Sequence, residues 1–522
     1  MLKKLHGRKL AVCLLGGAMY ALFSTFGWQA EHGGVIWAGG ALLVAALLVW
    51  PIAALLAVLL ERGYTRALRQ EKTFRAGRAF AFMLACYVPM FCVAFPGSFA
   101  YDVPYQLRQV VTGAYSTHHP LLHTLALGGL LQLGRALGDI NLGAALYTAL
   151  QMALLAGCFA LTCGSIARQS GARAAKRAAV FFALYPLNMV MAVNATKDVL
   201  FGGFFALTLA LLNEMQEKPS RGLALKIAVC GALAVMLRNN MAYAALVWLA
   251  LLTIGLRKGE KSAALAMLLA LAVGLCGNAA LKRATRAESG DMSEMLSWPI
   301  QQLARARLYD EDRLTDAEKE AIDELMPGEA WACYDPTISD PVKFEFDTQA
   351  FRADVKKYVG VWLSVGKKCA GTYLDATMAL TYPFFYPYRE YRVSGYYVQM
   401  GMSDAYDAGW CDFDPPESRS LFPRILASLS WRFGAKGAMQ IPVVGWLFNM
   451  GVIVWTMLFF ALREMYWGRW RRFGTALLPV LLWGTFLLGP VMAGRYIYPF
   501  VCALPVLAAR PGRIVKEAAR HG

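Results

Sequence analysis

A small set of charged and polar side chains, separated by long apolar stretches, gives this sequence its capacity for chemistry. Asp102 follows a Pro-Gly pair at 96–97, and the adjacent His118 and His119 come soon after. One carboxylate, two imidazoles and three cations form the set needed to bind an anionic head group and deprotonate a hydroxyl. The candidates are Asp102, His118 and His119, the cations Lys197, Arg238 and Arg495 as ligands of a lipid-linked phosphate, and Tyr101, Gln106, Asp198, Asn239 and Tyr496 as further pocket residues.

Each charged candidate also has a purely structural interpretation. Asp102 is placed to cap the N-terminus of a helix. Lys197 and Asp198 are neighbours that could form a local ion pair between two short spans. Arg238 and Arg495 stand at span boundaries, where arginines extend towards the interface. The sequence leaves both interpretations open.

The paired histidines do not indicate a metal site. Two adjacent side chains point in different directions, and no cysteine lies near His118 and His119 to complete a ligand set. We therefore expect no metal and no cofactor.

The composition is that of a membrane protein. Of 522 residues, 57% are hydrophobic and 17% are charged, against roughly 25% charged in an ordinary soluble domain. Several nearly uncharged runs are about 17 to 25 residues long, enough for a helix to cross a hydrocarbon core of about 30 Å. The alternation typical of a membrane barrel is absent, so the spans should be helices. The predicted fold class is an all-α polytopic membrane protein.

Apolar runs predict about twelve transmembrane helices. They fall at about 10–29, 35–60, 79–95, 142–166, 178–193, 198–213, 223–237, 240–256, 262–281, 440–462, 474–490 and 495–510. The net charge of +17 resides in short clusters between these runs, which argues against a nucleic-acid partner. The clusters alternate with loops poor in lysine and arginine, which predicts cytoplasmic termini and an extracytoplasmic site at the cell membrane.

Two of the outer segments are too long to be turns. Segment 96–141 contains an amphipathic stretch, Leu121 to Leu137, that predicts interfacial helices. Segment 282–439 is the one large polar block and predicts a small extracytoplasmic domain between the N-terminal module 1–281 and the C-terminal module 440–522. Its aromatic residues suit either glycan stacking or a packed cap. Cys333, Cys369 and Cys411 lie in it, and a disulfide among them is an open alternative.

Four short motifs resemble the GT-C superfamily of membrane glycosyltransferases. They are Pro-Gly-x-x-x-x-Asp at 96–102, His-His-Pro at 118–120, Lys-Asp at 197–198, and Gly-Arg-Tyr at 494–496 followed by Pro499. The chain also looks like an uncharacterised bacterial family of multi-spanning proteins near that superfamily, to which the stretch Ser297 to Arg305 adds.

The resemblance implies a transfer reaction and a role for each residue. Asp102 would be the catalytic base; Lys197, Arg238 and Arg495 would hold the phosphate of a polyprenyl-phosphate sugar donor; His118 and His119 would shape the pocket. The acceptor would be a cell-envelope glycan, a lipid or a protein. The chain departs from the superfamily in its second outer-loop carboxylate, for which Asp139 is the nearest candidate. The alternative hypotheses are a transporter or flippase of a lipid-linked sugar, and a non-catalytic membrane scaffold.

Overall fold

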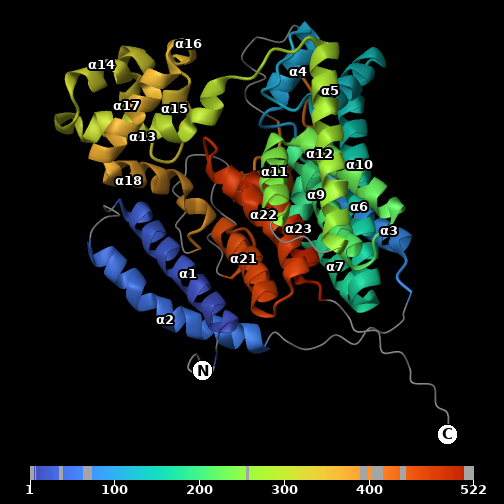
Figure 1. Cartoon of the computed structure of the whole chain (residues 1–522). Coiled ribbons are helices and arrows are strands. Elements are labelled where there is room, and N and C mark those ends of the chain that lie inside the picture. The colour runs from blue at the N-terminus through green and yellow to red at the C-terminus, as the bar shows by residue number, and fades with distance from the viewer. Residues whose placement is uncertain are drawn as a thin grey trace.

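The structure is a computed structural model, and it describes residues 5, 7–33, 39–62, 73–253, 258–387, 398–402, 415–434 and 443–510. In these ranges the regular elements are helices, joined by a few isolated β-bridges. Most helices form one bundle, while α13 to α18 form a second group beside one end of it (Figure 1). The predicted helical fold class is confirmed.

Six helices in the described part of the chain are long and apolar enough to cross a membrane. They are α1 (Arg8–His32), α2 (Gly39–Arg62), α3 (Ala76–Ala94), α6 (Ile140–Ser170), α9 (Lys197–Glu217) and α12 (Lys258–Thr285). Of the apolar window of α9, 83% is buried within the protein, against 17% for α2. Helix α9 is therefore central, and the first residue of this central helix is Lys197.

The remaining predicted spans coincide with shorter helices. These are α7 (Ala172–Leu184), α8 (Pro186–Ala192), α10 (Arg221–Leu237), α11 (Asn239–Thr253), α21 (Met450–Tyr466), α22 (Trp470–Leu487) and α23 (Tyr498–Ala508). The prediction of one continuous helix over 178–193 was wrong. Pro186 lacks an N–H and forces Tyr185 into an extended conformation, which ends α7 and starts α8. Twelve spans remain a prediction.

The segment 96–141 folds into α4 (Val103–Thr112) and α5 (Leu121–Ala136). Helix α5 packs closely on the start of α6, where two glycines meet. A Cβ on Gly143 would lie 2.3 Å from the Leu130 carbonyl oxygen, and one on Gly134 would lie 2.3 Å from the Gly143 nitrogen. Small residues thus allow the two backbones to touch, as is common between membrane helices.

The second group of helices has its own hydrophobic core. It contains α13 (Ser297–Tyr309), α14 (Asp316–Leu325), α15 (Asp340–Lys343), α16 (Thr348–Ala353), α17 (Val355–Lys368) and α18 (Ala370–Thr381). Its buried apolar residues run from Ile300 to Tyr373, whereas Phe385, Val398 and Met400 belong to the core of the bundle. The separate helical unit is thus shorter than the predicted block 282–439.

The cysteines of this region are unpaired where the structure describes them. Cys333 is exposed and Cys369 is buried, and both are free thiols. Cys411 lies outside the described residues, so a disulfide that includes it stays a prediction.

The α5–α6 contact predicts a matched pair of substitution effects. Gly143→Ala should lower the free energy of unfolding by about 1–3 kcal/mol, because the added methyl group meets backbone atoms that cannot rotate away. Gly129→Ala adds a methyl group to the exposed side of α5, where nothing lies within 4 Å, and should have no such cost. Denaturant unfolding in detergent would measure both; equal stability of the two variants would contradict the close packing.

Candidate functional site

One isolated β-bridge brings the loop before Asp102 next to the loop before Lys197, and a second joins it to Met402. Ser98 pairs with Asn194, and Phe99 pairs with Met402. The Ser98 N–H donates to the Val193 carbonyl at 2.8 Å, and the Ala195 N–H donates to the Ser98 carbonyl at 2.8 Å. Side chains that are far apart in the sequence are therefore fixed at one end of the bundle.

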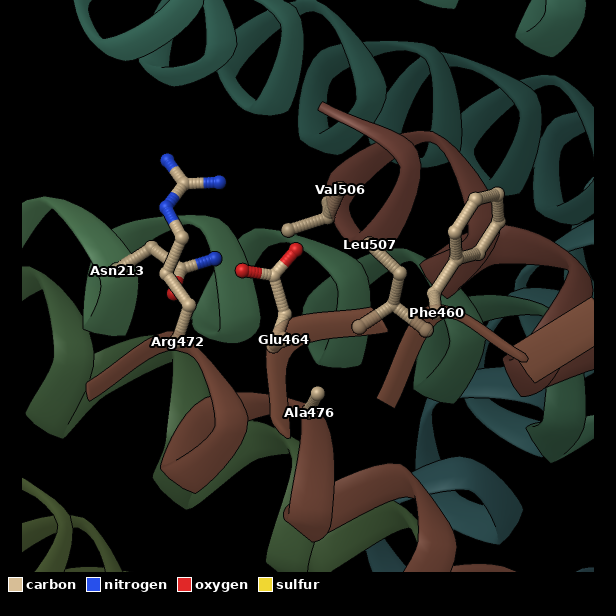
Figure 2. Close-up of a pocket in the computed structure, with 7 residues that line it drawn as sticks. All are labelled: Asn213, Phe460, Glu464, Arg472, Ala476, Val506 and Leu507. Carbon is tan, nitrogen blue, oxygen red and sulfur yellow. The ribbon is translucent and has the colours of Figure 1, made fainter. Parts of the chain in front are cut away.

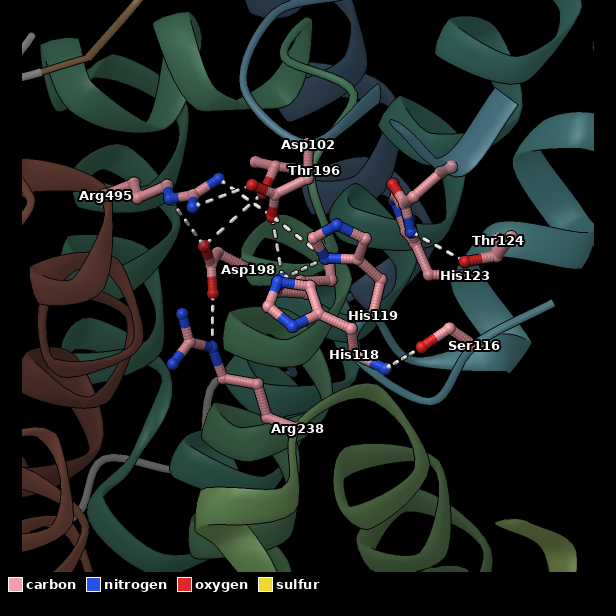
Figure 3. A network of polar contacts seen from close by, with 12 residues as sticks. Asp102, Ser116, His118, His119, His123, Thr124, Thr196, Asp198, Arg238 and Arg495 are labelled. Atoms are coloured by element: carbon pink, nitrogen blue, oxygen red, sulfur yellow. Dashed lines mark hydrogen bonds and ion pairs between the residues drawn. The ribbon is translucent and has the colours of Figure 1, made fainter. Parts of the chain in front are cut away.

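Asp102 lies between two cations, Lys197 and Arg495, and Figure 3 shows the contact with Arg495. Lys197 Nζ donates to Asp102 Oδ2 at 2.7 Å. The guanidinium of Arg495 donates to both carboxylate oxygens, at 3.2 and 3.1 Å. Asp102 occupies the N-cap position of α4, but its side chain makes no capping hydrogen bond. The N-cap interpretation therefore does not account for this carboxylate, whose side chain is 20% exposed.

A second ion pair adjoins the first. The Arg238 guanidinium donates to Asp198, whose side chain is 0% exposed, and Arg495 Nε lies 3.7 Å from the other oxygen of Asp198. The structural alternative of a local pair between Lys197 and Asp198 does not hold, because each of them pairs across the fold instead. The resulting row of alternating charges is Lys197, Asp102, Arg495, Asp198 and Arg238.

Aromatic rings hold the two arginines in this row. The Arg495 guanidinium carbon lies 4.5 Å from the centre of the Tyr101 ring and 5.3 Å from that of Tyr496. The Arg238 guanidinium lies 4.6 Å from both the Tyr496 and the Phe486 rings. Tyr101 and Tyr496 thus take part in the network by cation–π contact, and Phe486 is a contributor that the sequence analysis missed.

His119 also belongs to the network. Its Nδ1 lies 3.4 Å from Lys197 Nζ and 3.7 Å from Asp102 Oδ2. An ammonium group can only donate, so Nδ1 is the acceptor and a neutral His119 carries its proton on Nε2. The exposed His118 ring stands edge-on to His119, with the ring centres 4.6 Å apart.

Gln106 belongs to a different, fully buried chain of hydrogen bonds. Its side chain contacts His123 Nδ1 and Thr124, and His123 Nε2 lies 2.8 Å from the Tyr147 hydroxyl. That hydroxyl donates to Gln151, whose amide donates to the carbonyls of residues 192 and 194. The chain therefore braces the loop that leads to Lys197. The sequence analysis named Gln106 but missed His123, which lies four residues after His119.

Two other predicted residues lie apart from the network. Asn239 is exposed at the start of α11. Asp139 accepts a hydrogen bond from the Asn141 N–H at the start of α6 and pairs with Arg419 at 2.7 Å. Asp198, which shares Arg495 with Asp102, is the second carboxylate of the network, in place of the Asp139 that the sequence favoured.

Electrostatics fix the ionisation of these groups. Burial raises the pKa of Asp102, but Arg495 and Lys197 outweigh burial and hold this pKa well below its usual value. Burial, aided by the Lys197 charge, holds the pKa of His119 well below its usual value. Burial also lowers the pKa of His123 to about 3. At neutral pH the carboxylate is therefore ionised and both imidazoles are neutral.

The second helical unit touches both sides of the network. The segment before α13 pairs with the histidine loop, since the Glu288 N–H donates to the Tyr115 carbonyl and the Thr117 N–H donates to the Glu288 carbonyl, both at 2.9 Å. Trp298 Nε1 donates to the Leu487 carbonyl at 2.6 Å, and the Ser339 N–H donates to the Pro490 carbonyl at 2.9 Å. Residues 487–490 lead directly to Arg495.

A small cavity lies towards the far end of α9, lined by Asn213, Phe460, Glu464, Arg472, Ala476, Val506 and Leu507 (Figure 2). Asn213 is sixteen residues beyond Lys197, which corresponds to about 24 Å along a helix. The cavity is thus separate from the charged network. Among the residues that the structure describes, no group of three or more His, Cys, Asp or Glu side chains is placed to hold a metal ion.

The fold and the network define an α-helical membrane protein with a row of five alternating charges at one end of its bundle. Residues 110–521 match a protein-family model described as a family of unknown function (DUF6020), and the chain belongs to this family. No curated protein and no solved structure shows significant similarity to it. The match includes His119, Lys197, Arg238 and Arg495, while Asp102 precedes it.

The buried pair predicts a large loss of stability when one partner is removed. Arg238→Ala should lower the free energy of unfolding by about 3–5 kcal/mol, because Asp198 would stay buried with its closest cation gone. The control Arg221→Ala removes an exposed charge from the same helix and should change stability by less than about 0.5 kcal/mol. Denaturant unfolding in detergent measures both, and similar values would contradict a buried pair.

The neutral histidines predict a dependence of stability on pH. As the pH falls below about 6.5 the unfolded chain binds protons at His119 and His123, while the folded protein does not. The unfolded state then binds more protons, so stability falls on acidification by about 1.4 kcal/mol per pH unit for each histidine. His123→Gln should remove about half of this slope, and Gly129→Ala on the same helix should keep it. Unfolding curves at several pH values would show an unchanged slope in His123→Gln if the prediction fails.

Proposed function

We propose that this protein is a membrane glycosyltransferase that moves a sugar from a polyprenyl-phosphate donor to an extracytoplasmic acceptor. The observation that supports it most is the position of Asp102, a partly exposed carboxylate held between Lys197 and Arg495. A carboxylate beside cations that a phosphate could take over combines a base with an anion site.

Binding of the donor would give Lys197 and Arg495 a new partner and would thereby control the basicity of Asp102. With both cations in place the pKa of Asp102 is far below neutral, and such a carboxylate is a weak base. A donor phosphate would compete for Lys197 and Arg495, and their movement towards it would raise the Asp102 pKa. Asp102 would therefore become an effective base only when the donor is bound.

Asp102, Lys197 and Arg495 would supply the groups that the proposed reaction requires. Asp102 accepts the proton of an acceptor hydroxyl as that oxygen attacks the anomeric carbon of the sugar. The bond between this carbon and the phosphate oxygen breaks, and its electron pair leaves with the polyprenyl phosphate. Lys197 and Arg495 stabilise the charge that develops on the leaving phosphate, which favours the transition state over the bound substrate. Attack from the opposite face inverts the anomeric centre.

Two further features support an anion at this position. The Nε–H of Arg495 is buried and has no hydrogen-bond acceptor among the described residues, so a ligand oxygen would satisfy it. Helices α4, α5 and α9 begin at or just after Asp102, His119 and Thr196, and the N-terminal ends of helices favour negative charge. Arg238 is held by Asp198, so in this proposal it supports Arg495 and Tyr496 more than it meets the phosphate directly.

The proposal places the protein in the cell membrane with about twelve spans, cytoplasmic termini and an extracytoplasmic site. The polyprenyl chain would lie among the apolar helices, and the sugar would face the second helical unit. The acceptor would be a cell-envelope glycan, a lipid or a protein, and the reaction as written requires no metal or cofactor.

Loss of the proposed base should abolish transfer without unfolding the protein. Purified wild type and Asp102→Asn in lipid vesicles would be given a panel of polyprenyl-phosphate sugars, and free polyprenyl phosphate would be measured. We expect release by the wild type, and release reduced on the order of 100-fold or more by Asp102→Asn, as when a group that acts in the transition state is removed.

The controls separate the candidate functions. Asp139→Asn alters a carboxylate of the same segment that pairs with Arg419, and it should release at the wild-type rate. If no donor is consumed by the wild type while a labelled lipid-linked sugar crosses the vesicle membrane, the protein is a flippase and the transferase proposal is wrong.

A further inference from the structure

The segment Val398–Met402 lies against the loop that carries Asp102. The Phe99 N–H donates to the Gly401 carbonyl at 2.9 Å, and the Gly401 N–H donates to the Ser98 hydroxyl at 2.9 Å. Ser98 and Phe99 thus lie between residues 193–195 on one side and 401–402 on the other. About 300 residues of chain separate these partners, and a hydrophobic pattern gives no indication of the pairing.

Gln399 makes the contact nearest to the charged network. Its Oε1 accepts a hydrogen bond from the Tyr101 N–H at 3.4 Å. Its own N–H donates to the Tyr101 hydroxyl. One residue therefore binds Tyr101 at both its backbone and the tip of its side chain.

Tyr101 requires such support because of its backbone conformation. Its φ is 55°, in the left-handed region. A non-glycine residue in this region is held against a cost of order 1–3 kcal/mol, and such residues are common at functional sites. Asp102 is the next residue, so the conformation of Tyr101 sets the direction in which the Asp102 side chain leaves the backbone.

Tyr101 also contacts the other partner of the ion pair, since its ring lies 4.5 Å from the Arg495 guanidinium. We infer that Gln399 is a positioning residue: by holding Tyr101, it keeps Asp102 and Arg495 in register with each other. Gln399 acts through Tyr101 and does not touch the reacting atoms. This role rests on the proposed transferase function.

The test compares two variants of Gln399. Gln399→Ala removes the side-chain oxygen that accepts the Tyr101 N–H, while Gln399→Glu keeps an oxygen at the same distance along the side chain. In the polyprenyl-phosphate release assay, Gln399→Ala should lower kcat on the order of 10-fold to 100-fold, as expected for a misaligned site. KM should change by less than about twofold, because the loss falls on the transition state. Gln399→Glu should recover most of the rate.

A control and a second readout exclude a general folding defect. Ser430→Ala removes a hydrogen bond to the Met400 carbonyl in the same segment, at 3.4 Å, and should keep the wild-type kcat. Gln399→Ala removes only the acceptor of the Tyr101 N–H, so its unfolding temperature should fall only slightly, as expected for one lost hydrogen bond.

Each outcome decides a different claim. A wild-type rate in Gln399→Ala, or no recovery in Gln399→Glu, overturns the positioning role while the transferase stands. If the wild type releases nothing from any donor, the proposed function fails and the positioning role fails with it. A large fall in the unfolding temperature of Gln399→Ala would show a general folding defect and would overturn the positioning role.

Discussion

The sharing of Asp102 between Lys197 and Arg495 is the constraint on which the rest of the site depends. These three residues come from the loop before α4, the start of α9 and the turn before α23. Their charges meet at one end of the bundle, where the side chains are largely removed from water and an unpaired ion is costly. The ion pairs therefore link separate parts of the bundle. The same pairs also keep Asp102 ionised, and in the proposed reaction it would become a base only when another anion competes for its cations.

The sequence predicted which charged residues come together better than how they pair. Charge at span ends singled out Asp102, Lys197 and Arg495, because a membrane protein places ionisable residues there only at a cost. A local pair of Lys197 with its neighbour Asp198 was one of the two interpretations that the sequence left open. Consecutive helical residues point in different directions, so each found a partner across the fold. Gln399 carried no sequence signal, since a single polar residue in a polar segment resembles a loop residue.

The helices, too, were predicted from the sequence only in part. Long apolar runs were found correctly because hydrophobicity over about twenty residues is a strong signal. The break at Tyr185 was missed because apolar residues continue on both sides of Pro186. Hydrophobic composition gives no sign of the N–H that proline lacks. The separate core of the second helical unit ends at Tyr373, within the predicted block 282–439. Phe385, Val398 and Met400 are buried in the bundle, although the surrounding sequence is polar enough to resemble an outer domain.

The second helical unit is attached where it can affect both halves of the site. Glu288 is bonded to the loop of His119, and Trp298 and Ser339 are bonded to the segment before Arg495. These contacts use backbone carbonyls of the bundle, so their geometry depends on the path of the chain and little on side-chain identity. An acceptor bound to this unit would therefore lie close to the charged row, and any shift of the unit would move His119 and Arg495 relative to Asp102. Two segments therefore position the network. Val398–Met402 binds Tyr101, and the second helical unit binds the loops that lead to His119 and Arg495.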